Sequence, residues 1–157
     1  MTNTQIPVAI VGAPGYAGEG SLRILLGHPN FTIVHAGSDR LAGTRVDEAI
    51  PALRGDCGDL VLQADTPEHI LASKPQAIIL AKKSPDVTEI VPTLLASGVK
   101  VIDIGAEFRL HDIEDYKTYY GDQHACPEVL NQAVYGLSEI HSSAIKNAQL
   151  VGNPGCY

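Results

Sequence analysis

Basic side chains, cysteines and long apolar runs are all scarce in this sequence, and each scarcity excludes a class of protein. Lysine and arginine number 11 against 18 acidic residues, which gives a formal net charge of -7 and a pI near 5.2. A nucleic-acid partner is therefore not expected, because such proteins carry a basic face. The three cysteines lack Cys-x-x-Cys spacing, so neither a disulfide framework nor a metal site is indicated.

No apolar stretch approaches the about 18 residues that span a bilayer, and the N-terminus lacks a basic region followed by an apolar one. We therefore expect a cytoplasmic protein with no membrane partner. The 157 residues, of which 45% are hydrophobic, can bury a complete core, so we expect one domain over residues 1–157.

Apolar segments of strand length alternate with segments of helical periodicity. Strands are expected at residues 7–11, 31–36, 60–63, 76–81 and 99–104, and helices from the glycine turn to about residue 26 and at 66–73, 85–97 and 127–132. This alternation predicts an α/β fold with a Rossmann-type, doubly wound and mainly parallel sheet. The polar and aromatic stretch from residue 105 predicts a functional loop at the carboxyl ends of the strands.

A glycine-rich turn follows the first expected strand. Its three glycines have the spacing G-x-x-G-x-x-G, which departs from the G-x-G-x-x-G dinucleotide fingerprint and is also compatible with simple turns. Its place at the first strand-to-helix junction favours binding of a cofactor pyrophosphate at the helix N-terminus. The predicted cofactor-binding residues of this turn are Gly12, Ala13, Pro14, Gly15, Tyr16, Ala17 and Gly18.

The end of the second expected strand bears on the choice of nicotinamide cofactor. Ser38 and Arg40 suit the 2'-phosphate of NADP, whereas Asp39 suits the ribose hydroxyls of NAD unless its side chain points elsewhere. We predict NADP, with Ser38 and Arg40 as cofactor-binding residues.

Near the other end of the chain, Cys156 follows Asn153-Pro154-Gly155 after an apolar strand. A sharp turn there would aim the thiol, whose thiolate form can attack an acyl carbon. A loop thiol without chemistry is the alternative. Arg109 is a candidate to orient a substrate carboxylate, or to tie down the polar loop through Glu107 or Asp112.

Several further motifs lie in an order and spacing that are specific when taken together. On them, the chain resembles the N-terminal half of the N-acetyl-gamma-glutamyl-phosphate reductase family, which is similar in fold to aspartate-semialdehyde dehydrogenase. The motifs are Gly12 to Gly18, Ala42-Gly43, Pro51-Ala52-Leu53-Arg54-Gly55, Phe108-Arg109-Leu110, Tyr120-Gly121, Ala133-Val134-Tyr135-Gly136-Leu137 with Glu139, and Gly152-Asn153-Pro154-Gly155-Cys156-Tyr157.

The resemblance implies an NADPH-dependent reductase of a small acyl phosphate, in which Cys156 displaces phosphate and forms a thioester. It also implies a homo-oligomeric whole protein with a substrate domain after this cysteine, so we expect residues 1–157 alone to be an inactive dinucleotide-binding part with an ordinary thiol. Residues 81–85 and 103–107 depart from the family pattern. They leave open a carrier-linked aminoadipyl-phosphate reductase or an aspartate-semialdehyde dehydrogenase, while a non-catalytic dinucleotide-binding module is the alternative of another class.

Overall fold

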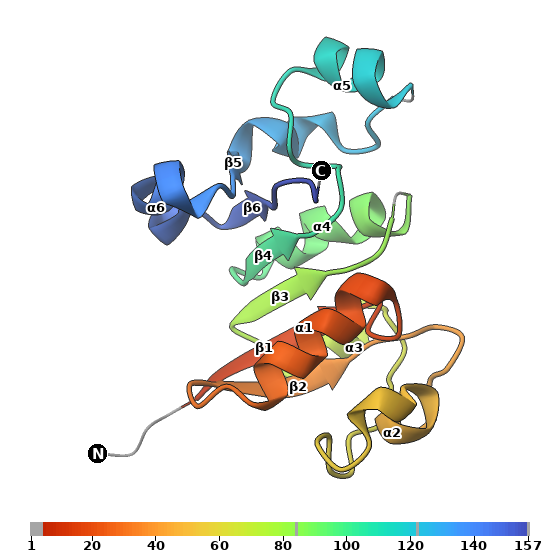
Figure 1. The fold of residues 1–157 in the computed structure, drawn as a ribbon. Helices are drawn as coiled ribbons and strands as arrows, with labels where there is room; N and C mark the ends of the chain where they lie inside the picture. Colours follow the sequence, from red (N-terminus) through yellow and green to blue (C-terminus); the bar gives the residue numbers. More distant parts are fainter. Residues whose placement is uncertain (1–4, 84, 122, 157) are drawn as a thin grey trace. The chain divides into compact units, whose positions relative to one another are not determined.

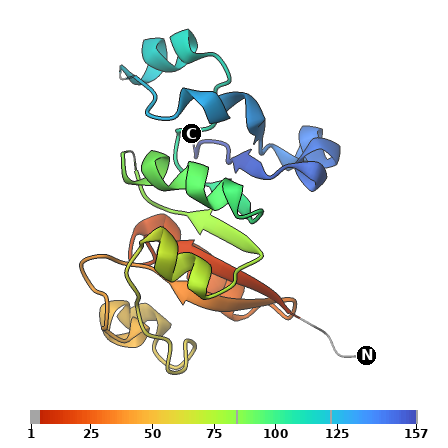
Figure 2. The ribbon, with the colours of Figure 1, turned by 180° about the vertical axis from the view of Figure 1, so that it is seen from behind.

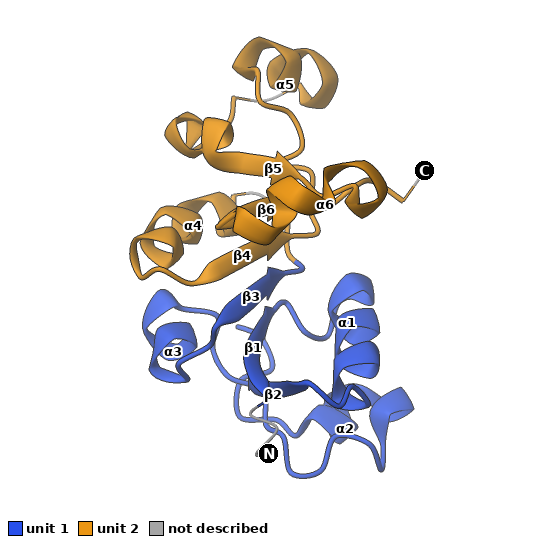
Figure 3. Ribbon diagram, turned by 90° about the vertical axis from the view of Figure 1, so that its left-hand side faces the viewer, with its two compact units in different colours: residues 1–81 blue, residues 82–157 orange. Residues whose placement is uncertain are grey.

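The computed structural model describes residues 5–83, 85–121 and 123–156. It divides into two compact units, residues 1–81 and residues 82–157, which Figure 3 colours separately.

The first unit is a parallel three-stranded α/β arrangement. Its elements are β1 (Ile6–Val11), α1 (Tyr16–Leu26), β2 (Phe31–Ala36), α2 (Val46–Ala49), the short 3-10 helix η1 (Pro51–Leu53), α3 (Pro67–Ala72) and β3 (Ala77–Leu80). Strand β1 lies between β2 and β3 and is parallel to both. Helices α1 and α3 cover opposite faces of these strands (Figures 1 and 2). The carboxyl ends of β1 and β2 therefore open at the same edge.

The core of this unit explains why its strands form. Strand β1 buries four consecutive residues, Val8 to Val11, which is typical of a strand covered on both faces. Ile10 packs with Leu22 of α1 and with Leu53 and Leu62 of the segment that follows β2. This packing fixes α1 and the strand ends around the glycine turn.

The second unit repeats the parallel arrangement with a different set of helices. Its elements are α4 (Asp86–Ala96), β4 (Lys100–Asp103), α5 (Ile113–Tyr120), the 3-10 helix η2 (Pro127–Gln132), β5 (Ala133–Tyr135), α6 (Ser138–Asn147) and β6 (Leu150–Gly152). Strand β6 lies between β4 and β5 and is parallel to both. The predicted α/β, Rossmann-type fold with parallel strands is confirmed.

Two predictions of local structure are wrong. Residues 60–63 form no strand but only isolated bridges, Gly37 with Gln63 and Arg45 with Val61. The stretch expected to be a loop contains α5, whose first amides are capped by the Asp112 side chain and which ends at Gly121 with a φ of 81°. An aspartate at the N-cap and a glycine in the left-handed conformation after the last turn are ordinary helix boundaries. Within the described ranges, none of the helices has the length and apolar character needed to cross a membrane.

Candidate functional site

The glycine turn between β1 and α1 depends on two of its glycines for its shape. Gly12 has a φ of 76°, a conformation that side-chain-bearing residues rarely adopt. Gly18 lies against the turn so closely that a Cβ there would be 2.2 Å from the Gly12 carbonyl oxygen. Gly15 has more room, with its nearest neighbour at 3.4 Å. Gly12 and Gly18 thus build the turn, while Gly15 leaves an exposed backbone free of a side chain.

The first amides of the turn are used within the protein. The N–H of Gly12 donates to Asp65 Oδ2 at 3.2 Å, that of Ala13 donates to the Gly37 carbonyl at 2.8 Å, and that of Gly15 donates to the Gly12 carbonyl at 3.1 Å. Since Pro14 has no N–H, none of the first four residues of the turn offers an unengaged amide to a ligand.

The next three amides differ. The N–H groups of Tyr16, Ala17 and Gly18 form the first turn of α1 and have no hydrogen-bond acceptor within residues 5–83, 85–121 and 123–156. Such amides lie at the positive end of a helix and suit an anion. Among the predicted turn residues, Tyr16, Ala17 and Gly18 therefore have backbone N–H groups that can bind an anion, whereas the four residues before them do not.

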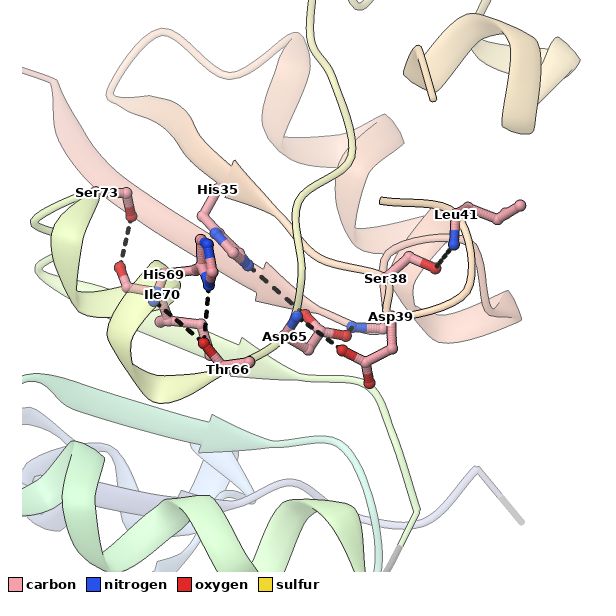
Figure 4. A network of polar contacts seen from close by, with 10 residues as sticks. His35, Ser38, Asp39, Leu41, Asp65, Thr66, His69, Ile70 and Ser73 are labelled. Atoms are coloured by element: carbon pink, nitrogen blue, oxygen red, sulfur yellow. Dashed lines mark hydrogen bonds and ion pairs between the residues drawn. The ribbon is translucent and has the colours of Figure 1, made fainter. Parts of the chain in front are cut away.

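The strand end after β2 places the other predicted cofactor residues in the same unit. Ser38 is buried, and its Oγ accepts the N–H of Leu41 at 3.3 Å, which leaves the hydroxyl proton available to a ligand. Arg40 is exposed and makes no hydrogen bond or ion pair within the described part of the chain. Asp39 Oδ1 accepts the backbone N–H of Asp65 at 2.9 Å (Figure 4).

A buried histidine and aspartate lie beneath this edge. His35 and Asp65 have fully buried side chains, and His35 Nε2 is 3.6 Å from Asp65 Oδ1. Gly37 is enclosed by the pair, since a Cβ there would be 1.5 Å from Asp65 Oδ1 and 2.8 Å from His35 Nε2. Neither residue was predicted from the sequence. The one local signal was a histidine inside a mainly apolar strand.

In the second unit, Arg109 fixes the backbone that leads to Cys156. Its Nε donates to the Asn153 carbonyl at 2.8 Å and its Nη2 to the Ile104 carbonyl at 3.0 Å. Gly152 makes this possible, because a Cβ there would be 2.1 Å from the Phe108 carbonyl oxygen. Because Phe108 packs closely on Gly152 of β6, the guanidinium of Arg109 lies within hydrogen-bond distance of the Asn153 carbonyl.

Of the two roles considered for Arg109, the structure displays the tie of the loop, made through the backbone carbonyls of Asn153 and Ile104. Cys156 itself is exposed, three residues beyond the anchored carbonyl of Asn153. The last residue of the motif, Tyr157, lies outside the described residues.

Two buried carboxyl groups adjoin this loop. Glu107 accepts the Tyr116 hydroxyl at 2.6 Å, and its backbone carbonyl is 2.9 Å from His124 Nε2. Asp103 is fully buried, and its Oδ1 accepts the Gly105 N–H at 2.9 Å, while its Oδ2 has no hydrogen-bond partner among the described residues. Burial, reinforced by the negative charge of Glu107, raises the pKa of Asp103 from 3.8 to about 6.

The comparison with protein families identifies one domain. Residues 7–148 match the family model described as semialdehyde dehydrogenase, NAD binding domain. Curated relatives named N-acetyl-gamma-glutamyl-phosphate reductase include a protein of Alkalilimnicola ehrlichii, 42% identical over 98% of this chain, and one of Psychrobacter arcticus, 44% identical over 98%. The chain spans 44% and 43% of the length of these two relatives. The resemblance stated from the motifs is confirmed.

Solved structures agree on the fold. Aspartate semialdehyde dehydrogenase II of Vibrio cholerae, complexed with ASA, superposes with a TM-score of 0.65 at 22% identity, over 98% of this chain and 42% of that one. Aspartate semialdehyde dehydrogenase of Candida albicans, solved with NADP, gives 0.59 at 22% identity over 68% of this chain and 31% of that one. With the family match over most of its residues, the chain belongs to the semialdehyde dehydrogenase NAD-binding domain family.

Proposed function

We propose that residues 1–157 are the dinucleotide-binding part of an NADPH-dependent N-acetyl-gamma-glutamyl-phosphate reductase, an enzyme of arginine biosynthesis. The observation that carries the proposal is the agreement of relatives bearing that name at 42% identity over 98% of the chain. That agreement favours N-acetyl-gamma-glutamyl phosphate as the substrate over an aminoadipyl phosphate or aspartate semialdehyde.

The proposed chemistry belongs to Cys156. Its Sγ, as thiolate, attacks the carbonyl carbon of the acyl phosphate, so that a C–S bond forms while the C–O bond to phosphate breaks and phosphate leaves with the electron pair. NADPH, when bound, supplies the hydride that reduces the resulting thioester to the semialdehyde, which restores the thiolate. Arg109 supports this role, because it fixes the loop before Cys156 and brings a positive charge to a place where anions react.

The cofactor residues fit a dinucleotide. The three amides of Tyr16, Ala17 and Gly18 would hold the pyrophosphate, and the bare backbone at Gly15 lets it approach. The hydroxyl of Ser38 and the guanidinium of Arg40 would hold the 2'-phosphate, for which Arg40 is available because it has no protein partner within the described residues.

Two experiments test the proposal separately. The 157-residue chain is titrated with NADPH and with NADH, and saturable binding that favours NADPH is expected. A chimaera then places this chain in the Alkalilimnicola ehrlichii relative, instead of the segment that it matches, and is assayed for phosphate-dependent reduction of NADP by N-acetylglutamate semialdehyde.

Cysteine variants of the chimaera provide the control. Cys156→Ala should lower turnover by about a thousandfold or more, because the thioester cannot form. Cys57→Ala, which replaces a buried cysteine in the first unit, should leave turnover unchanged. A chimaera that binds NADPH but oxidises none of the semialdehydes offered would favour the non-catalytic module. Faster oxidation of aspartate semialdehyde than of N-acetylglutamate semialdehyde would contradict the proposed substrate.

We also propose that the whole protein is a cytoplasmic homo-oligomer, as the family resemblance implies. Sedimentation of the chimaera beside the unmodified relative tests the assembly. A monomer in both would contradict it.

A further inference from the structure

Three residues far apart in the sequence form a continuous link along the edge of the first unit. Asp39 Oδ1 accepts the backbone N–H of Asp65 at 2.9 Å, and Asp65 Oδ2 accepts the N–H of Gly12 at 3.2 Å. Figure 4 shows Asp39 and Asp65 facing one another, with His35 on the other side of Asp65. We name this link, made of Asp39, Asp65 and Gly12, the acidic brace.

The brace joins the two halves of the proposed cofactor site. Asp39 belongs to the turn that carries Ser38 and Arg40, and Gly12 begins the turn that presents the α1 amides. Backbone bonds run alongside, since the Ser38 N–H donates to the Gln63 carbonyl at 2.7 Å. Residues 63–65 thus contact both turns, so that a displacement of either turn disturbs the other.

The brace also explains why Asp39, an acidic residue at the position that usually selects NAD, is compatible with binding of NADP. An aspartate that follows the second strand selects NAD by accepting the ribose hydroxyls, and its charge repels a 2'-phosphate. Here one oxygen of the Asp39 carboxylate is held by the Asp65 amide. The orientation of Asp39 is then set by the protein, while the exposed side chain of Arg40 can meet the phosphate.

We propose that Asp39 and Asp65 are positioning residues for dinucleotide selection. Asp39 keeps the Ser38 to Arg40 turn in the conformation that receives the 2'-phosphate and does not read the ribose, and Asp65 keeps Gly12 in the conformation that receives the pyrophosphate. This inference rests on the proposed dinucleotide binding and adds two residues whose role is exerted through the protein rather than by contact with the cofactor.

The test is a titration of the 157-residue chain and its Asp39 variants with NADPH and NADH. Asp39→Asn keeps an oxygen that can accept the Asp65 N–H, so NADH affinity should stay within about twofold, and NADPH affinity should be equal or higher because a negative charge is gone. Asp39→Ala removes the acceptor, and NADPH affinity should fall by about fivefold with a smaller change for NADH. Glu48→Gln, which removes an exposed charge elsewhere in the unit, should change neither.

Amide exchange supplies a readout that does not depend on the cofactor. The Asp65 N–H should be protected in the wild type and in Asp39→Asn and should exchange about tenfold faster in Asp39→Ala. Asp65→Ala should weaken both dinucleotides alike, with circular dichroism to establish that it folds. If it does not fold, Asp65→Asn takes its place, with a loss shared equally by NADPH and NADH expected.

The outcomes separate this inference from the proposed function. A wild-type chain that binds neither dinucleotide contradicts the cofactor site itself. Binding by the wild type, with a tenfold or larger loss of NADH affinity in Asp39→Asn and unchanged NADPH affinity, would mean that Asp39 reads the ribose, and the inference would be overturned. Unchanged affinities and unchanged Asp65 exchange in Asp39→Ala would overturn it as well.

Discussion

Replacement of Asp103 by asparagine should change how the stability of the chain depends on pH. The Asp103 carboxyl is fully buried at the end of β4, and its Oδ1 accepts the Gly105 N–H. Glu107 disfavours its ionised form and Arg109 favours it, but burial is the largest effect and raises the pKa to about 6. The folded protein therefore keeps a proton on Asp103 at pH values where the unfolded chain has lost it.

The sign and size of the effect follow from linkage. Between about pH 4 and about pH 6 the folded state binds one more proton than the unfolded state, so the free energy of unfolding falls as the pH rises. At about 1.4 kcal/mol for each pH unit, a rise in the pKa from 3.8 to about 6 corresponds to about 3 kcal/mol. Below this window the Asp103 carboxyl is neutral in the folded and the unfolded state, and above it the carboxyl is ionised in both states. The asparagine variant has no proton to lose.

Urea unfolding followed by circular dichroism, at several pH values from about 4 to about 8, gives the required free energies. As the pH rises through the window, the free energy of unfolding of Asp103→Asn should increase by about 3 kcal/mol relative to that of the wild type. This change should be independent of any difference in stability between the two proteins at low pH. Asp56→Asn, which removes an exposed carboxylate, serves as the control and should show no such trend. A difference between wild type and Asp103→Asn that stays constant within about 0.5 kcal/mol across the range would refute the reasoning.

The remaining predictions concern the turn and the two loops that carry candidate residues. Gly18→Ala should lower the free energy of unfolding by about 2 kcal/mol or more, because its Cβ would be 2.2 Å from a carbonyl oxygen, whereas Gly20→Ala, with nothing within 4 Å, should raise it by about 1 kcal/mol in urea titrations. Iodoacetamide should modify Cys156 first in the native chain, since Cys126 is buried and its pKa is raised to about 12 by burial; peptide mapping that finds Cys126 labelled as fast would contradict this. Arg109→Met should accelerate exchange of loop amides near Cys156, and equal exchange in both proteins would refute the anchoring role.

The fold could be predicted from the sequence where burial leaves a clear pattern. Strand β2 lies at residues 31–36 as expected, and α1 and α4 end within a residue of their predicted limits. Helix α5 escaped prediction because only Tyr116 of its eight residues is buried, so its apolar periodicity is weak. Its boundaries, Asp112 and Gly121, were the better signal. The expected strand at residues 60–63 failed because its apolar residues fill the core from a loop, as Leu62 does.

The candidate site was predictable only in its local parts. The glycine turn and the cysteine motif could be recognised, since each consists of neighbouring residues. The acidic brace joins Asp39 to Asp65 across 26 positions and Asp65 to Gly12 across 53, and no sequence periodicity connects residues at such separations. The same holds for Arg109 and Asn153, which are 44 positions apart.

Both units use the same physical device at the ends of their parallel strands. A polar side chain from one segment binds the backbone of another: Asp65 accepts the Gly12 N–H in the first unit, and Arg109 donates to the Asn153 carbonyl in the second. Such a bond fixes a loop that would otherwise sample many conformations. A glycine turn moved alone into another parallel sheet should therefore bind dinucleotide poorly, because the turn would lack the acceptor that holds Gly12. Transfer of binding should require an acid at the position of Asp65 as well.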